Sequence, residues 1–197
     1  MNSMAQGLKT GTVAGISLIT TLLVGLYFIP DLMRRREFVF SPPTSNSAPA
    51  VPMNYSLARV QASDAPQKKS LSLAEMSKSD KQVYIINFWA TWCPPCIDEF
   101  PNLEYLHRQL ATLGPNAPKL VAISVDEGSA EIKRLFGTLS FTPTMTILHD
   151  PSGTMASKLG TTKFPETYLV DAKGRVLHKW VGPQNWLSDS VLGEIKK

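Results

Sequence analysis

Cysteine and histidine are both scarce in this chain. Its 197 residues include 2 cysteines and 3 histidines. Two cysteines exclude a disulfide-dense scaffold and a four-cysteine zinc site. The histidines His107, His149 and His178 are scattered along the sequence. The composition therefore predicts no structural metal site.

A large excess of charge of one sign is also lacking. Lys and Arg number 20 against 16 Asp and Glu, and 16 basic against 14 acidic residues remain after position 40. The domain therefore lacks the excess of basic residues that is typical of nucleic-acid-binding domains, so we expect no nucleic-acid partner. Apolar residues make up 43% of the chain and charged residues 18%, which is a globular balance and excludes wholesale disorder.

One long uncharged segment lies near the N-terminus, behind a short tail at 1–9. Lys9 and Asp31 enclose 21 residues without a charge, 10–30. A segment of about 20 uncharged residues is long enough to cross a bilayer as a helix. A cleaved signal peptide is the alternative, but the run exceeds the usual h-region of about 7–15 residues and no A-x-A-like site follows closely. We therefore predict a retained transmembrane anchor at 10–30.

A proline-rich linker follows, at 31–52. Residues 41–52 read SPPTSNSAPAVP, a composition typical of semi-extended spacers. Residues 53–197 are then expected to form one domain, which is long enough to bury about two-thirds of its unfolded surface.

Strand and helix patterns alternate along this domain. Apolar runs rich in β-formers predict strands, and apolar residues every three or four positions predict helices. A hairpin turn is expected at 171–174. The sequence thus predicts an α/β fold with a central mixed sheet flanked by helices. The expected strands are 83–88, 120–125, 145–148, 166–170 and 176–181, and the expected helices are the segment after Pro94 up to Gly114, then 131–136 and 186–195.

Both cysteines lie in one motif, Trp92-Cys93-Pro94-Pro95-Cys96, between a predicted strand and its helix. A C-x-x-C pair at such a junction indicates redox chemistry. The first cysteine gains thiolate character from the positive end of the helix dipole. We therefore expect Cys93 to be the nucleophile and Cys96, one turn inside the helix, to be the resolving thiol.

Other functions of the pair are disfavoured. Zinc would need two further ligands, and covalent haem needs a histidine where Ile97 stands. A structural disulfide closing four residues would add little stability. A copper(I) chaperone and a non-catalytic docking module remain as alternatives.

The segment 87–96, Asn-Phe-Trp-Ala-Thr-Trp-Cys-Pro-Pro-Cys, resembles the active-site segment of thioredoxin-fold proteins of the TlpA/ResA group. Pro101 matches the proline inside the first helix of that fold. The resemblance covers about 70–197 and implies a thioredoxin fold.

The segment 164–171, Phe-Pro-Glu-Thr-Tyr-Leu-Val-Asp, resembles the cis-proline strand of the same family. Pro165 is then the expected cis-proline, and Pro143 is the competing candidate. This form of the motif is closest to the cytochrome c maturation reductants. Phe164 departs from the small residue or Thr that often precedes this proline.

Further site residues follow from this resemblance. Asn87 stands where thioredoxin has a buried Asp and cannot accept a proton. Glu99, three residues after Cys96, therefore becomes the expected proton-transfer residue, whereas Asp98 is expected to face solvent. The expected substrate-binding residues are Trp92, Pro94, Pro95, Phe164 and Glu166, although Glu166 could equally be a solvated strand residue.

The sequence thus predicts a membrane-tethered thiol–disulfide oxidoreductase without a cofactor, most simply a reductant. Its partners would be a disulfide-containing protein, such as an apocytochrome c with its C-x-x-C-H disulfide, and a membrane electron donor. The alternative substrate class is other proteins of the cell envelope. Arg34, Arg35 and Arg36 favour a cytoplasmic domain by the positive-inside rule. Dithiols need a dedicated electron source outside the cytoplasm, however, so we expect the domain on the extracytoplasmic, periplasmic side of the inner membrane.

Overall fold

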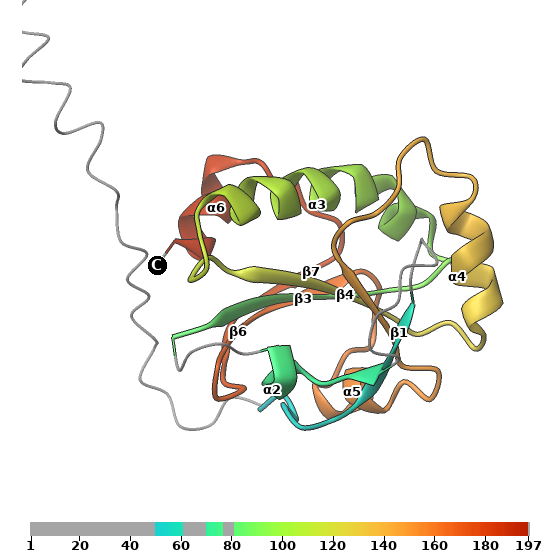
Figure 1. The fold of residues 1–197 in the computed structure, drawn as a ribbon, viewed down its shortest axis with the longest axis horizontal. Helices are drawn as coiled ribbons and strands as arrows, with labels where there is room; N and C mark the ends of the chain where they lie inside the picture. Colours follow the sequence, from blue (N-terminus) through green and yellow to red (C-terminus); the bar gives the residue numbers. More distant parts are fainter. Residues whose placement is uncertain (1–49, 61–69, 77–80, 197) are drawn as a thin grey trace, which may run out of the picture. The chain divides into compact units, whose positions relative to one another are not determined.

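The computed structural model describes residues 50–60, 70–76 and 81–196. Within these ranges the chain forms one mixed sheet with the strand order β2-β1-β5-β4-β3-β6-β7 (Figure 1). The expected anchor at 10–30 and most of the expected linker lie outside the described residues. Among the helices that are described, none has the length and apolar character needed to traverse a bilayer.

The middle of the sheet is parallel and its two sides are antiparallel. Strands β3, β4 and β5 run parallel, while β6 pairs antiparallel with β3 and β7 pairs antiparallel with β6. On the other side, β1 pairs antiparallel with both β5 and β2. The strand bounds are β1 (Leu57–Val60), β2 (Ser70–Leu71), β3 (Val83–Trp89), β4 (Lys119–Ser124), β5 (Thr146–His149), β6 (Glu166–Asp171) and β7 (Val176–Val181).

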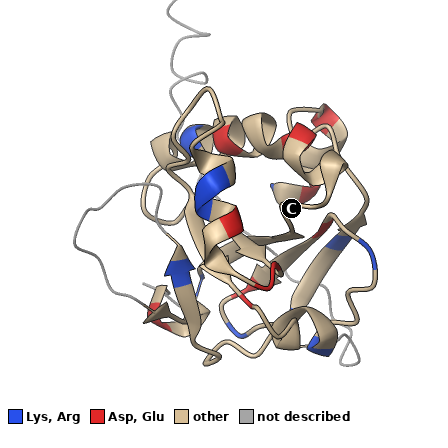
Figure 2. Ribbon diagram, turned by 90° about the vertical axis from the view of Figure 1, so that its right-hand side faces the viewer, with Lys and Arg blue, Asp and Glu red and all other residues tan. Residues whose placement is uncertain are grey.

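Helices cover both faces of this sheet (Figure 1). One core lies against α3 (Pro94–Thr112), α4 (Ser129–Phe136) and α6 (Asp189–Ile195). A second core, on the opposite face, contains side chains of α2 (Leu73–Met76) and α5 (Thr154–Lys158). Figure 2 shows acidic and basic residues interspersed on the visible elements, in keeping with the near-balance of charge.

The alternation of side chains along β3 positions a polar residue against α3. Ile85 and Trp89 belong to the core on the α3 side, whereas Tyr84, Ile86 and Phe88 belong to the opposite core. Asn87 has the same parity as Ile85 and Trp89, so its side chain points toward α3. The same parity rule places Thr167 on the α3 side of β6, directly opposite Asn87.

The thioredoxin-like α/β architecture expected from the sequence is confirmed in its central part. The strands β3, β4, β6 and β7, the long helix α3 and the short helix α4 fall where the apolar patterns placed them. These elements have strong periodic patterns because they are buried on one or both faces.

The C-terminal half differs from the prediction in two places: one helix was missed and another begins later than expected. The segment after the turn at 150–153 forms α5, which the sequence pattern did not predict. The Asp150 carboxylate accepts hydrogen bonds from the N–H groups of Thr154, Met155 and Ala156 and so organises this five-residue helix. Trp186 lies before α6 and not within it, because Ser188 caps the helix by accepting from the N–H of Val191.

The first strands of the sheet were also missed. β1, β2 and α2 have two to four residues each, which is too short for a periodic signal. Val51 was assigned to the linker, but it is buried in the second core and its N–H donates to the Gly174 carbonyl at 2.7 Å. The packed domain therefore includes residues 50–52.

Candidate active site

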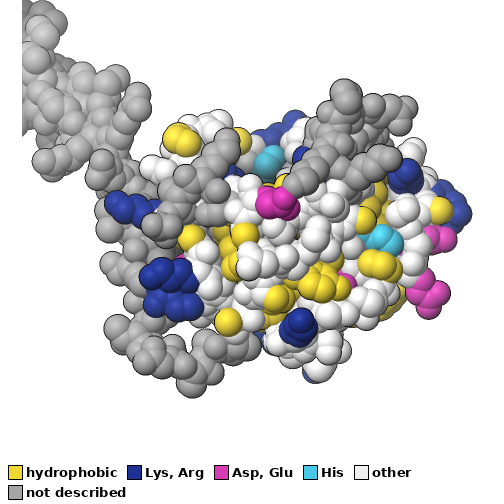
Figure 3. Space-filling model, turned by 60° about the horizontal axis from the view of Figure 1, so that its bottom comes forward, with side chains coloured by type: hydrophobic (Ala, Val, Ile, Leu, Met, Phe, Trp, Pro, Cys, Tyr) yellow, Lys and Arg dark blue, Asp and Glu magenta, His cyan; other side chains and the backbone are white. Residues whose placement is uncertain are grey.

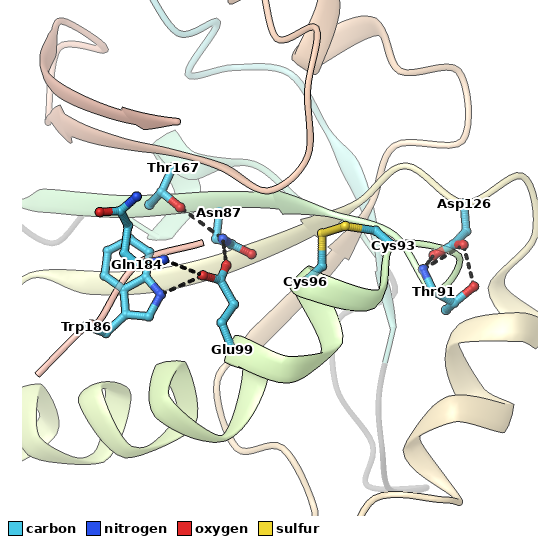
Figure 4. Close-up of a disulfide and its surroundings, with 9 residues drawn as sticks. All are labelled: Asn87, Thr91, Cys93, Cys96, Glu99, Asp126, Thr167, Gln184 and Trp186. Carbon is cyan, nitrogen blue, oxygen red and sulfur yellow. Dashed lines mark hydrogen bonds between the residues drawn. A yellow bond between two sulfur atoms is a disulfide. The ribbon is translucent and has the colours of Figure 1, made fainter. Parts of the chain in front are cut away.

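The two cysteines form a disulfide at the N-terminus of α3 (Figure 4). Cys93 is the N-cap residue, and its carbonyl accepts from the N–H groups of Cys96 and Ile97 at 3.0 and 3.2 Å. Cys93 is 5% exposed and Cys96 is 1% exposed. Cys93 is therefore the slightly more exposed residue of a buried pair, the order expected for the attacking residue.

Pro94 and Pro95 occupy the first two positions of α3. Neither proline has an N–H, so two of the orphan donors that usually surround a helix N-terminus are missing. Both rings are exposed beside the disulfide. A thiolate at Cys93 is consequently less stabilised by backbone donors than at other C-x-x-C helices.

An apolar surface borders the disulfide. Trp92 is 63% exposed, and its ring meets that of half-buried Phe164 edge to face, with the centroids 5.7 Å apart. The Phe164–Pro165 peptide bond is cis, and Pro143, the competing candidate, is trans. Pro165 is buried and its carbonyl accepts from the N–H of Gly182 at 2.9 Å.

The loop between β3 and α3 is held by one buried carboxylate. Asp126 accepts from the Thr91 N–H at 3.0 Å and from the hydroxyls of Thr91 and Ser124 at 2.7 Å each (Figure 4). Its own carbonyl lies 2.7 Å from Nε2 of His149 on β5. Asp126 thereby fixes the backbone that leads directly into Trp92 and Cys93.

Glu99 lies one turn after Cys96 and points from α3 toward the sheet (Figure 4). It is 4% exposed. Its Oε1 accepts from Asn87 Nδ2 at 3.0 Å, and its Oε2 accepts from the Gln184 N–H at 3.2 Å and from Trp186 Nε1 at 3.1 Å. All three donors are neutral, so within the described part of the chain the buried carboxylate is paired with no cation.

Burial raises the pKa of Glu99 above its ordinary value, and the hydrogen bonds from Gln184, Trp186 and Asn87 oppose this rise without cancelling it. A buried carboxyl with a raised pKa holds its proton further toward neutral pH than a solvated one does. Glu99 thus differs from Asp98, which is exposed on the same helix, as the sequence analysis expected.

The raised pKa of Glu99 predicts a pH-dependent stability that Glu99→Gln removes. Between the ordinary and the raised pKa the folded state binds more protons than the unfolded state, so the stabilising contribution falls as pH rises. We expect the unfolding free energy of the wild type to fall relative to Glu99→Gln by up to about 1.4 kcal/mol per pH unit in this window. Urea unfolding of both proteins at several pH values measures this difference.

Glu127→Gln is the matched control, because Glu127 is exposed. Its stability should stay parallel to that of the wild type across the same pH range. A wild type that gains stability relative to Glu99→Gln as pH rises would contradict the raised pKa.

Glu166 does not face solvent, which corrects both expectations for it. It is 2% exposed, and its Oε2 lies 2.9 Å from the Tyr168 hydroxyl and 3.1 Å from Lys179 Nζ. The Tyr168 hydroxyl also lies 2.9 Å from Thr161 Oγ1, in the segment that precedes Phe164. Glu166 therefore belongs to a buried network on the α5 side of the sheet and offers no free carboxylate to a substrate.

The sequence analysis missed several residues of this site. Asp126, Gln184 and Trp186 are distant from the cysteine motif along the chain and share no spacing with it. The one signal in the sequence was Trp186 itself, because a tryptophan that becomes buried usually needs an acceptor for its indole N–H. Within the described ranges, no three His, Cys, Asp or Glu side chains are arranged to hold a metal ion.

Comparison with known proteins agrees with this architecture. A curated relative, the thiol:disulfide interchange protein DsbE homolog of Paracoccus denitrificans, is 39% identical over 103 residues, which is 51% of this chain and 51% of that protein. The chain thus matches about half the length of this relative. The thioredoxin-like protein YneN of Bacillus subtilis is 33% identical over 65% of this chain and 77% of its own length.

A secreted thiol-disulfide isomerase from Corynebacterium glutamicum shares the fold. Its crystal structure gives a TM-score of 0.58 over 81% of this chain and 99% of that chain, at 17% identity. The sequence profile of the AhpC/TSA family matches residues 52–179, which include the cysteine motif, Glu99 and Pro165. Because this match covers more than half of the chain, the protein belongs to the AhpC/TSA family, which confirms the thioredoxin-like resemblance noted in its sequence.

Proposed function

We propose that this protein is a thiol–disulfide oxidoreductase that reduces disulfides in other proteins. The observation that carries the proposal is the Cys93–Cys96 disulfide at the N-terminus of α3, with the exposed Trp92 next to it in the chain. The curated relative from Paracoccus is named for the same chemistry. No cofactor is needed, because the dithiol itself carries the two electrons.

The reaction begins from the reduced pair. The Cys93 thiolate attacks one sulfur of the substrate disulfide, forms a mixed disulfide and releases the other substrate sulfur as a thiolate. The Cys96 thiol loses its proton to Glu99 and attacks Cys93, which releases the second substrate sulfur. The substrate gains two electrons, the Cys93–Cys96 pair becomes a disulfide, and the protons pass to the substrate thiolates.

The surface beside the cysteines suits an extended peptide. The backbone N–H and C=O of Phe164 have no hydrogen-bond partner among the described residues, although the neighbouring strand β6 is fully paired. A substrate strand can add to such unpaired groups, and the rings of Trp92 and Phe164 then supply apolar contact. Pro94 and Pro95 complete this substrate surface.

The proposed substrate is the C-x-x-C-H disulfide of an apocytochrome c, which rests on the family resemblance of residues 164–171. A general reductant of other envelope proteins is the second candidate, because an open apolar surface selects weakly among peptides. In both cases a membrane protein must return electrons to Cys93 and Cys96, since the chain has no further cysteine for a relay.

Residues 10–30 are proposed to anchor the protein in the inner membrane, with residues 31–49 as a tether to an extracytoplasmic domain. The support is the uncharged length of 10–30 and the proline content of the segment that follows. Arg34–Arg36 oppose this orientation. Protease added outside spheroplasts should digest the domain; a protected domain would place it in the cytoplasm.

The reduction potential of the Cys93/Cys96 pair in the full-length protein tests the direction of electron flow. Because Pro94 and Pro95 donate no hydrogen bonds to a Cys93 thiolate, we expect a reducing potential, near or below about −230 mV. Equilibration of the protein with glutathione or thioredoxin of known reduction potential measures the potential of the pair. A potential near about −120 mV, as in a strong oxidant, would reverse the proposed direction.

A further inference from the structure

The buried amide of Asn87 lies between two oxygen atoms. Its Nδ2 is 3.0 Å from Glu99 Oε1 and 2.9 Å from Thr167 Oγ1 (Figure 4). The side chain is fully buried, and among the described residues its Oδ1 has no hydrogen-bond partner. One end of this amide thus makes two bonds while the other end makes none, which is unusual for a buried polar group.

The second oxygen of Glu99 faces groups that only donate. The Gln184 backbone N–H and the Trp186 indole N–H both point at Oε2. Neither group can accept a proton in a hydrogen bond. A proton taken up by Glu99 therefore has no acceptor at Oε2 and must reside on Oε1, the oxygen that faces Asn87.

In the orientation shown, a protonated Oε1 and the Nδ2–H of Asn87 would be two hydrogen-bond donors that point at each other. A half turn of the amide removes this conflict, because Oδ1 then stands where Nδ2 stands now. The Thr167 hydroxyl follows without moving, since a hydroxyl either accepts from Nδ2 or donates to Oδ1. Oε1 of Glu99 thus has a matching partner in both charge states, and the turned Nδ2 takes the position where Oδ1 makes no hydrogen bond to a described residue.

We propose that Asn87 is a positioning residue for Glu99, and that its amide turns by half a turn each time Glu99 gains or loses a proton. The orientation shown, with Nδ2 toward Oε1, belongs to the ionised carboxylate. The turned orientation, with Oδ1 toward Oε1, belongs to the protonated acid. The raised pKa of Glu99 brings this exchange toward neutral pH.

Few other ionisable groups face Glu99 from the elements packed around it. On α3, the thiol of Cys96 lies one turn before Glu99. It does not titrate in the oxidised protein, because it forms the disulfide with Cys93. Asn87, Thr167, Gln184 and Trp186 do not titrate. On β7 and α6, His178 and Glu194 lie 3.5 Å from each other, and the rings of Trp180 and Trp186 stand between His178 and Glu99.

The inference rests on the proposed role of Glu99 as the proton carrier for Cys96. A carrier works best when a hydrogen-bond partner is available to each of its protonation states, because the carboxyl oxygen that gains or loses the proton is then never left unpaired. The neutral amide of Asn87 can pair with Glu99 in either protonation state. An aspartate at the same position would add a second negative charge beside Glu99. The amide turn itself is measurable without any turnover.

Nuclear magnetic resonance of the oxidised full-length protein tests the turn. Oxidation removes both thiols from the titration, so a pH-dependent change at Asn87 reports Glu99. We expect cross-peaks between the Asn87 side-chain amide protons and the Thr167 methyl group at high pH, and their loss at low pH. The midpoint should equal that of the Glu99 carboxyl carbon. Asn102, exposed on the same helix, is the internal control and should keep its amide contacts throughout.

Glu99→Gln provides a second, independent readout. The donors Gln184 and Trp186 force its carbonyl oxygen into the Oε2 position, so its amide nitrogen takes the Oε1 position and donates to Asn87. The Asn87 amide should then be turned at every pH, with the Thr167 cross-peaks absent. Cross-peaks that persist through the Glu99 titration, or in Glu99→Gln, would overturn the inference, whereas loss of disulfide exchange alone would bear only on the proposed function.

Discussion

Replacing Cys93 with serine is expected to abolish protein disulfide reduction. A serine hydroxyl is not ionised near neutral pH and does not form a disulfide, so the first step of exchange has no nucleophile. Reduction of insulin by the pre-reduced full-length protein should fall to the uncatalysed background. Precipitation of the insulin B chain, followed by turbidity, measures this rate.

Cys96→Ser is the matched control for this experiment. It keeps the attacking thiol but lacks the resolving one, so a mixed disulfide between Cys93 and the substrate should accumulate and be visible by non-reducing electrophoresis. Residual reductase activity in Cys93→Ser, or a mixed disulfide through Cys96, would contradict the assigned roles. Equal substrate binding by all variants without any reduction would instead favour the non-catalytic docking module.

Glu104→Ala is expected to lower the free energy of unfolding by about 1 to 3 kcal/mol. The buried Glu104 carboxylate links α3 to the segment before β5 by accepting from the Thr144 N–H at 3.0 Å, the Thr144 hydroxyl, and the Met145 N–H at 3.3 Å. It also accepts from Arg108 Nε at 2.8 Å. Alanine leaves the two backbone N–H groups without an acceptor.

Urea unfolding of the full-length protein, followed by tryptophan fluorescence, measures this loss. Asp98→Ala is the control, since Asp98 is exposed on the same helix and should change stability by less than about 0.5 kcal/mol. Burial alone would raise the pKa of Glu104, but the hydrogen bonds from Thr144, Arg108 and Met145 outweigh it and leave the pKa lowered. The destabilisation should therefore be full near neutral pH and shrink as pH falls through the lowered pKa; a loss independent of pH would contradict this.

The central elements of the fold were predictable because each carries a strong local pattern. β3 and β4 read as continuous apolar runs since both of their faces are buried. α3 shows an apolar residue every three or four positions because one side of it packs on the sheet. β1, β2 and α5 lack such patterns, since two to five residues are too few for periodicity. β1 is placed by pairing with β5, β2 by pairing with β1, and α5 by the Asp150 carboxylate.

The exposure of individual polar residues was predicted from the sequence less accurately than the buried apolar core. Trp92 is exposed next to the disulfide, as expected, but Glu166 is buried and contacts Tyr168 and the partly exposed Lys179. On the side that carries α2 and α5, Figure 3 shows hydrophobic side chains mixed with polar and backbone atoms over the visible surface. Whether a polar strand residue faces solvent thus depended on the helix that covers it.

The sequence by itself determined the redox pair, the order of the central strands and helices around it and the cis-proline before β6. Cys93, Cys96 and the apolar runs on either side lie within one short stretch, where local spacing decides the chemistry and the backbone. Only the tertiary structure decided the environment of Glu99. Its partners come from β3 and from the segment before α6, and Trp186 stands 87 residues along the chain. Burial against these partners raises the pKa of the carboxyl, because the pKa of a buried group is set by what surrounds it in space and not by its neighbours in sequence.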